Sequence, residues 1–409
     1  MLVNNNELLE RFLKYVKIWT TSDSEVADKG KCPSTTRQFD LAEILEEEMK
    51  QLGLKDVKIT DTCFIYGYLP ASEGFEDKDS ILLMSHIDTA EDVSGENIHP
   101  LVWKEYVDDK LILPNGLFIE GRELKEAIAN KETIITSDGT TLLGADDKAG
   151  IAAIITAIDI LNKHPEIKHP KIEVMFSPDE ETGHSMDHVP LDMIKSKSAY
   201  TVDGGHIGEL EIECFNAWKS EITFTGNAIH TGSGRPNLVN AVTMAARFVT
   251  NLPLQEAPET TDGYQGFYAP MGIEGSMESA KVTVFLRDFN AEEMEYRKKL
   301  IEILANSTAL SFHGKAQVEH KFQYANMKGK MDENPRVVIR LINAYKKADV
   351  HPRIVPIRGG TDGSRLTEMG IPTPNIFTGG HNYHSRKEWC SLQQMSKATE
   401  VLVNLCAEE

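Results

Sequence analysis

Short apolar strands alternate with helical segments along the first half of the chain, and this alternation is the strongest sign of its fold. Strands are predicted around Cys63–Leu69 and Ile81–Ile87, and an apolar helix is predicted over Lys148–Leu161. Short apolar strands between helices are typical of a buried, largely parallel sheet with helices on both faces. The alternation stops near Asp203 and returns after about Asp332. The sequence therefore predicts an α/β fold with a mixed, mostly parallel sheet.

A segment with a different pattern interrupts the alternation. From Glu211 the predicted elements are paired strands, a helix over 237–252, a strand over 279–290, a helix over 291–307 and a strand over 316–326. We interpret these elements as a β-α-β-β-α-β style arrangement, which predicts a ferredoxin-like α+β domain inserted into the chain. We expect a discontinuous catalytic domain over 1–210 and 331–409, and an inserted lid or dimerisation domain over 211–330.

Composition excludes several kinds of partner. The 409-residue chain has a formal net charge of −20, so binding to nucleic acid or to an anionic membrane would begin with repulsion. No basic leader followed by an apolar run begins the sequence, and the most apolar stretch (150–161) is too short to cross a bilayer. We expect a cytoplasmic protein with neither kind of partner. Five cysteines without a CxxC pair favour reduced thiols: Cys32, Cys63, Cys214, Cys390 and Cys406.

Polar side chains follow several of the predicted strands. His86 and Asp88 follow the apolar run ILLM, and residues i and i+2 of a strand point to the same face. One of them could hold a metal ion while the other orients it. A structural His–Asp hydrogen bond at a strand end explains this pair equally simply when it is taken alone.

Two runs of adjacent acids give further signals. Asp146 and Asp147 stand before the apolar helix, where capping accounts for one acid but not for two. Asp179, Glu180 and Glu181 follow the strand KIEVMF, and three adjacent acids repel one another unless they are solvated or neutralised by a cation. In the functional interpretation, one glutamate binds metal and its neighbour acts as a general base.

The remaining signals are Asp203, which ends the strand SAYTVD, and two histidines, His381 and His384, which follow PTPNIF. Ligands bind at the carboxyl ends of parallel strands, and imidazoles with carboxylates are a donor set for zinc or manganese. A carboxylate that bridges two ions about 3.5–4 Å apart allows them to activate one hydroxide between them. The sequence contains no HExxH motif, which argues against a single-zinc site of that kind.

The whole set of motifs resembles the co-catalytic dizinc aminoacylase/carboxypeptidase superfamily, and within it most closely a group of cytosolic tripeptide aminopeptidases. The resemblance covers nearly the whole chain and implies a zinc-exopeptidase-like catalytic domain. The motifs that carry it are SHIDT, DGTTLLGADDKAGIA, SPDEE, YTVDGG, GYQGFY, FLRDF, PIRGGTDGSRL and NIFTGGHNYH.

This resemblance implies a role for each residue of the metal site. One ion would be held by His86, Asp146 and Asp203, and the other by Asp146, Glu181 and His384. Asp146 would bridge the two ions, as the aspartate two residues before the lysine. Glu180 would be the general base, and Asp88 a second catalytic acid that orients His86. His381 is not expected to be a ligand.

Three residues outside the metal site also match the family. His230 matches a histidine that stabilises the tetrahedral oxyanion, commonly from the partner subunit, although it also fits an ordinary turn residue. Arg287 matches an arginine that binds the terminal carboxylate of the substrate, and a plain surface or core-edge arginine remains the alternative. Arg358, before a glycine-rich turn, is expected to line the substrate pocket.

The resemblance implies a metallo-aminopeptidase that acts in peptide catabolism. It would release the N-terminal residue of tripeptides by attack of a dizinc-bound hydroxide on the scissile carbonyl. Two Zn²⁺ per subunit are implied, with Mn²⁺ or Co²⁺ as substitutes, and a homodimer is possible. Two alternatives stay open: a dizinc carboxypeptidase or N-acyl amino acid deacylase on the same scaffold, and a non-catalytic metal-binding peptide sensor.

Overall fold

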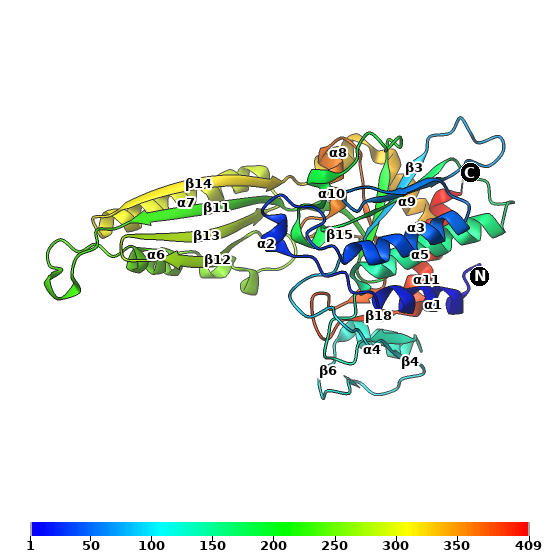
Figure 1. Ribbon diagram of the computed structural model, residues 1–409, viewed down its shortest axis with the longest axis horizontal. Helices are drawn as coiled ribbons and strands as arrows, with labels where there is room; N and C mark the ends of the chain where they lie inside the picture. Colours follow the sequence, from blue (N-terminus) through cyan, green and yellow to red (C-terminus); the bar gives the residue numbers. More distant parts are fainter. Residues whose placement is uncertain (1, 408–409) are drawn as a thin grey trace. The chain divides into compact units, whose positions relative to one another are not determined.

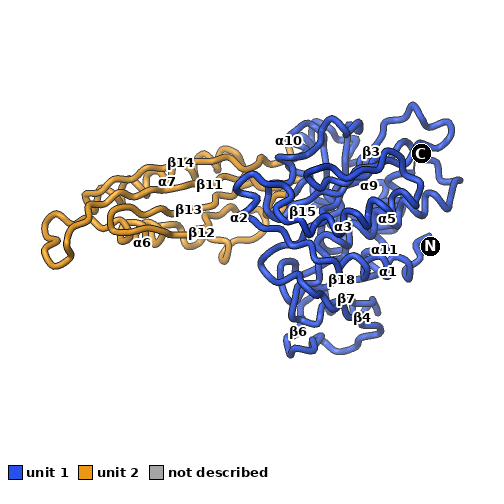
Figure 2. Tube along the Cα trace, viewed as in Figure 1, with its two compact units in different colours: residues 1–212, 329–355, 361–409 blue, residues 213–328, 356–360 orange. Residues whose placement is uncertain are grey.

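A computed structural model describes residues 2–407 as two compact units (Figure 2). Unit 1 comprises the described parts of Met1–Ile212, Gly329–Val355 and Thr361–Glu409, and unit 2 comprises Glu213–Lys328 and Pro356–Gly360. The short segment Pro356–Gly360 returns to unit 2 late in the chain, and no sequence pattern indicates this. None of the helices in the described part is both long and apolar enough to span a bilayer.

An eight-stranded mixed sheet forms the centre of unit 1. Its four middle strands β8, β3, β9 and β16 are parallel, and antiparallel strands extend it on both sides. Every residue of β8 and β3 is buried, as expected for strands covered on both faces. In sheet order the strands are β1 (Lys55–Ile59), β2 (Ile65–Leu69), β8 (Ile172–Ser177), β3 (Ile81–His86), β9 (Ala199–Gly204), β16 (Asn375–Phe377), β10 (Glu209–Cys214) and β15 (Arg353–Ile357).

Helices and connecting segments cover both faces of this sheet, which confirms the predicted α/β class. On one face, α5 packs against β3 and β9 and is itself covered by α1 and α11 (Figure 1). On the other face, Leu82 and Met84 of β3 pack with Met186 and with Leu366 of α10. The helices of unit 1 are α1 (Asn5–Val16), α2 (Ser24–Ala27), α3 (Gln38–Gln51), α4 (Arg122–Ala129), α5 (Ala145–Lys163), α8 (Lys328–Glu333), α9 (Pro335–Lys347), α10 (Asp362–Glu368) and α11 (Leu392–Cys406).

A close approach brings α5 against the sheet. A Cβ atom at Gly150 would stand 1.9 Å from the carbonyl oxygen of Val202 in β9 and 2.6 Å from Oγ of Ser85 in β3. Glycine is therefore required at this position, because any side chain would push the helix away from the strands. The start of α5 and the ends of β3 and β9 are thereby held together.

A second, smaller sheet in unit 1 was not predicted from the sequence. Leu111, Leu124, Ile134 and Trp389 contribute to its apolar core with α4. In sheet order its strands are β17 (Gly380–His381), β18 (Trp389–Ser391), β7 (Ile134–Thr136) and β4 (Leu101–Trp103), and a separate hairpin is formed by β5 (Leu111–Ile112) and β6 (Phe118–Ile119).

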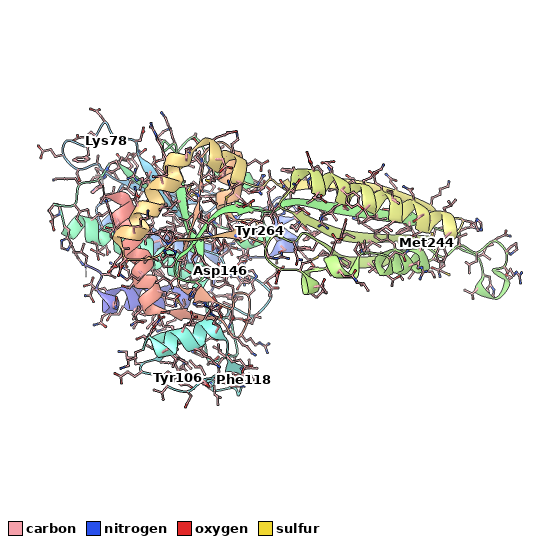
Figure 3. All side chains as sticks on the ribbon, turned by 180° about the vertical axis from the view of Figure 1, so that it is seen from behind. Lys78, Tyr106, Phe118, Asp146, Met244 and Tyr264 are labelled. Carbon is pink, nitrogen blue, oxygen red and sulfur yellow. The ribbon has the colours of Figure 1, made fainter. Side chains whose placement is uncertain are left out.

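Unit 2 is an antiparallel sheet covered by two helices, in the β-α-β-β-α-β order expected of the inserted domain. Its strand over Phe267–Gly275 was not among the predicted elements, and of the paired strands predicted from Glu211 the first, β10, belongs to the sheet of unit 1. Asn240 and Asn290 cap the two helices through their side chains. Met244 on α6 (Figure 3) and Phe248 pack with Val282 and Leu286 of the sheet. In sheet order the strands are β12 (Phe267–Gly275), β13 (Ser279–Asp288), β11 (Asn216–Thr225) and β14 (Lys315–Tyr324), and the helices are α6 (Ala241–Thr250) and α7 (Ala291–Ser311).

Gly150→Ala tests the close approach of α5. We expect a destabilisation of about 1–3 kcal/mol or more, because the added methyl group overlaps backbone and side-chain atoms of the sheet. Gly329→Ala in α8 is the matched control, since no atom lies within 4 Å of a Cβ at that position. It should be neutral or stabilise by up to about 1 kcal/mol. Urea unfolding of the two variants measures the difference, and equal midpoints would contradict the packing described here.

Candidate metal centre

Histidine and carboxylate side chains from five separate segments of unit 1 meet at the ends of its strands. They form two groups whose possible ligand atoms all lie within 4.8 Å of one another. The first group contains His86, Asp146 and Asp203, and the second contains Asp146, Glu181 and His384. Asp146, labelled in Figure 3, belongs to both groups. The structure therefore brings together the residues that the family resemblance selected.

The first group is built by neighbouring strands. His86 ends β3 and Asp203 lies in β9, and these two strands are parallel neighbours. The Nε2 atom of His86 lies 2.9 Å from Oδ1 of Asp146 and 3.5 Å from Oδ1 of Asp203. Because parallel strands end at the same edge of a sheet, their last side chains meet there.

The second group depends on loops. His384 lies between β17 and β18, and its Nε2 atom is 3.4 Å from Oδ2 of Asp146 and 2.9 Å from Oε2 of Glu181. The two oxygens of Asp146 thus face different imidazoles. This is the arrangement that a bridging carboxylate requires.

Both histidines also contact an acid through their second ring nitrogen. The Nδ1 atom of His86 lies 3.3 Å from Oδ1 of Asp88, and Nδ1 of His384 lies 3.3 Å from Oδ2 of Asp92. Histidines that bind metal ions usually donate their other N–H to a carboxylate or carbonyl, which directs the free nitrogen to the ion. Both imidazoles are oriented in this way.

The carboxylates of this cluster repel one another. Burial raises the pKa of Glu181 and of Asp203 to about 7, and the nearby Asp146 adds to both shifts. Against the effect of burial, hydrogen bonds from His384 and His86 hold the pKa of Asp146 below its usual range. The cluster therefore lacks enough positive charge to offset its carboxylates.

One oxygen in the cluster lacks a partner. Oε1 of Glu181 is buried and makes no hydrogen bond to any described residue, although an unpaired buried oxygen is costly. A cation would satisfy this oxygen and reduce the repulsion. The nitrogen and oxygen donors present match the preferences of zinc and manganese, so the residues fit a metal site.

Asp88 contacts residues of both groups. It is fully buried, and its carboxylate accepts the backbone N–H of Glu180 at 3.0 Å and that of Glu181 at 3.2 Å. It contacts His86 with the same carboxylate. Glu180, at the start of the short helix Glu180–Thr182, lines a small pocket with His86 and Asp203. Asp88 therefore positions both an imidazole and the segment that carries the glutamates.

The two adjacent acids before α5 have different environments. Asp147 is fully buried and accepts hydrogen bonds from the Ser85 hydroxyl and from the backbone N–H of His86 and Gly150. Its carboxylate thus joins the start of α5 to β3, whereas Asp146 faces the imidazoles. The peptide bond between them is cis.

His381 lies apart from both groups. Its ring stacks on Trp389 with centroids 3.9 Å apart, and its Nε2 atom is 3.3 Å from Oε1 of Gln394. Burial lowers the pKa of His381 to about 3, so it is a neutral, packed side chain.

The other expected site residues lie in unit 2. His230 is exposed, and its Nδ1 atom accepts the backbone N–H of Gly232. Arg287 is buried and donates from Nη1 to Gln323. Arg358 donates to the carbonyl oxygens of Gly263 and Gln265 and to Thr261. Each arginine is held by its own unit.

Supporting residues beside the centre were not predicted. Oδ1 of Asn375 accepts the backbone N–H of Asp203 at 3.0 Å, and Asp92 contacts His384. A third such residue, Glu388, is buried close to Asp146. Asn375 and Glu388 lie within or next to a motif of the family resemblance. Nothing in the residue type alone indicates which distant segment these side chains reach.

Comparison with known proteins agrees with this fold and site. The model of peptidase family M20/M25/M40 matches residues 137–408. Relatives named Peptidase T from Clostridium acetobutylicum and from Geobacillus sp. (strain WCH70) are each 43% identical, over 98% of this chain and 98% of their own. Among solved structures, aminopeptidase PepT from Bacillus cereus aligns with a TM-score of 0.76 at 24% identity over 99% of both chains.

A more distant structural neighbour has the same fold. The Bacillus subtilis YXEP protein, described as a dinuclear metal-binding peptidase of the M20 family, aligns with a TM-score of 0.65 at 13% identity over 98% of this chain and 97% of its own. Fold, clustered donors and relatives define a hydrolase with a metallopeptidase architecture. The chain belongs to peptidase family M20/M25/M40, and the predicted family resemblance is confirmed.

Asp146→Asn tests whether the shared carboxylate holds metal. Added zinc or manganese should raise the unfolding temperature of the unaltered protein, because a ligand of the folded state at about 100 times its Kd stabilises by about 2.7 kcal/mol. The variant should lose most of this increment. Asp159→Asn on the same helix is the control, since Asp159 pairs with Arg11 and Lys163 and takes no part in the cluster. An undiminished increment in Asp146→Asn would contradict the proposed ligand.

Proposed function

We propose that the protein is a dizinc aminopeptidase that removes the N-terminal residue from tripeptides. The observation that carries this proposal is that Asp146 belongs to both groups of candidate metal ligands, with Glu180 beside them. The 43% identity to relatives named Peptidase T over nearly the full length supports the same substrate class.

Two zinc ions would be held by the two groups that share Asp146. His86 and Asp203 complete one site, and Glu181 and His384 complete the other. Bound there, the ions would act as Lewis acids on the scissile carbonyl and lower the pKa of the attacking water. The mixed nitrogen and oxygen donors favour zinc and also suit Mn²⁺ or Co²⁺.

Glu180 is the proposed general base. It is not a member of either ligand group, and its side chain lines the pocket beside His86 and Asp203. Glu180 would accept a proton from the attacking water and donate it to the amine nitrogen of the leaving peptide. Asp88 keeps this residue in place through its backbone N–H and orients His86. A protein that only sensed peptides would have no use for such a base.

Residues of unit 2 are proposed to recognise the substrate. His230, with its exposed imidazole, would stabilise the oxyanion. Arg287 is proposed to bind the terminal carboxylate of the peptide, since a guanidinium group forms paired hydrogen bonds to a carboxylate, and Arg358 is proposed to line the substrate pocket. Their bonds to Gln323 and Thr261 hold the two guanidinium groups in fixed orientations.

We also propose a homodimer that works in the cytoplasm. Strand β12 is an edge strand of the sheet in unit 2, and its Met271 and Ile273 side chains are exposed. Edge strands with apolar side chains favour pairing with another chain. The five cysteines are free thiols, as is usual in a reducing compartment.

A panel of blocked and free peptides tests the function. We expect the zinc-loaded protein to cleave a free tripeptide at its first peptide bond, and a chelator to abolish this activity. A dipeptide and an N-acetylated tripeptide should be poor substrates, because recognition would require the free amine and the length of a tripeptide. Chromatography of the products gives the site of cleavage. Preferential hydrolysis of an N-acyl amino acid or release of the C-terminal residue would instead support the deacylase or carboxypeptidase alternative.

Glu180→Gln tests the general base. The variant should bind zinc as the unaltered protein does, while kcat on the tripeptide falls by about 10²–10⁴, the usual contribution of a positioned acid–base group. Glu46→Gln on the surface helix α3 is a control of equal charge change and should keep full activity. Metal analysis and steady-state kinetics on the same samples give both quantities. Full activity in Glu180→Gln would refute this role.

A further inference from the structure

Glu388 is a buried carboxylate outside both ligand groups and without a role in the proposed reaction. It lies directly before β18, and only 1% of its surface is exposed. Oε2 accepts the backbone N–H of Leu143 at 2.6 Å and of Gly144 at 2.8 Å, and Oε1 accepts that of Asp146 at 3.1 Å. Both oxygens of one carboxylate are thus engaged by the turn that carries the shared ligand.

These three donors belong to the turn before the regular part of α5. The backbone of Asp146 and Asp147 is not helical, and the helix that follows is capped by Asp147, whose Oδ1 accepts the backbone N–H of Gly150 at 3.2 Å. Buried backbone N–H groups need acceptors. For the three N–H groups of this turn the acceptor is Glu388, which comes from a part of the chain more than 240 residues away.

Glu388 also belongs to the segment that follows the loop of His384. Glu388 follows His384 by four residues, and its backbone N–H donates to the carbonyl oxygen of Ser385 at 3.2 Å. The next residue, Trp389, pairs with Thr136 of β7. A single side chain therefore connects the loop carrying His384 to the turn carrying Asp146, and Nε2 of His384 lies 3.4 Å from Oδ2 of Asp146.

We propose that Glu388 is a positioning residue that sets the distance and orientation between Asp146 and His384, and so the affinity of the second metal site. This inference rests on the proposed function, since it assumes that these two side chains bind an ion. Partners of metal ligands typically change metal affinity by 10- to 100-fold when they are altered. Glu388 would act through the backbone of a ligand, because it accepts the N–H of Asp146.

Metal binding by Glu388→Gln tests the proposal. The amide keeps the size of the side chain, but its NH₂ group must face at least one of the three backbone donors. We expect the affinity for the more weakly bound Zn²⁺ to fall at least tenfold in calorimetric titration. With Co²⁺ in place of zinc, the visible absorption spectrum should change, because the ligand geometry at the second site is altered.

A matched control separates positioning from stability. Glu173 is also a buried carboxylate of unit 1 and accepts the backbone N–H of Lys195 and Ser196. Glu173→Gln should lower the unfolding temperature while leaving zinc affinity and the Co²⁺ spectrum unchanged. If Glu388→Gln does not fold, Glu388→Asp keeps the charge, but its shorter side chain cannot reach all three donors, so it should show the same loss of affinity.

The outcomes separate this inference from the proposed function. Unaltered zinc affinity and Co²⁺ spectrum in a folded Glu388 variant would overturn the positioning role while the parent protein still bound zinc and cleaved tripeptides. Equal loss of affinity in Glu173→Gln would also overturn it, since that result would indicate a general effect of stability. A parent protein that bound no metal would overturn the inference and the proposed function together.

Discussion

Acidic side chains are concentrated in one small, largely buried region of unit 1, and the surrounding structure has to offset their mutual repulsion. Burial and neighbouring charge raise the pKa of Glu181 and Asp203 to about 7, and Oε1 of Glu181 has no partner among the described residues. Such an arrangement lowers the stability of a chain unless a ligand compensates for it. Two cations shared by Asp146 would provide that compensation and would also supply the reactivity of a hydrolase.

The scaffold holds these acids by side chains that come from other segments. Asp88 accepts the backbone N–H groups of Glu180 and Glu181, Asn375 accepts that of Asp203, and Glu388 accepts that of Asp146. The three segments that carry the acids of the cluster are therefore each held by a hydrogen bond to their backbone. This anchoring opposes the separation of the segments that repulsion between the carboxylates would favour.

The main features of the fold followed from local patterns. The buried strands β3 and β8 contain the apolar runs ILLM and VMF, and strands β11, β13 and β14 and helices α6 and α7 of unit 2 were predicted from the periodicity of their segments. The small sheet of β17, β18, β7 and β4 was not predicted, because its strands are only two or three residues long. Strands of that length carry too few side chains to establish an alternation.

Local sequence determined that acids and imidazoles would lie near strand ends. A polar residue directly after an apolar run indicates where a buried strand leaves the core. Local sequence did not distinguish Asp146 from Asp147 without the family motif. In the tertiary structure Asp147 is held by Ser85 and by the backbone of β3, while Asp146 faces His86 and His384. Likewise, Leu143 and Glu388 are 245 residues apart, and only the packing of α5 and β18 brings them together. Hydrogen bonds of this kind depend on positions in space, which residue type and local spacing do not encode.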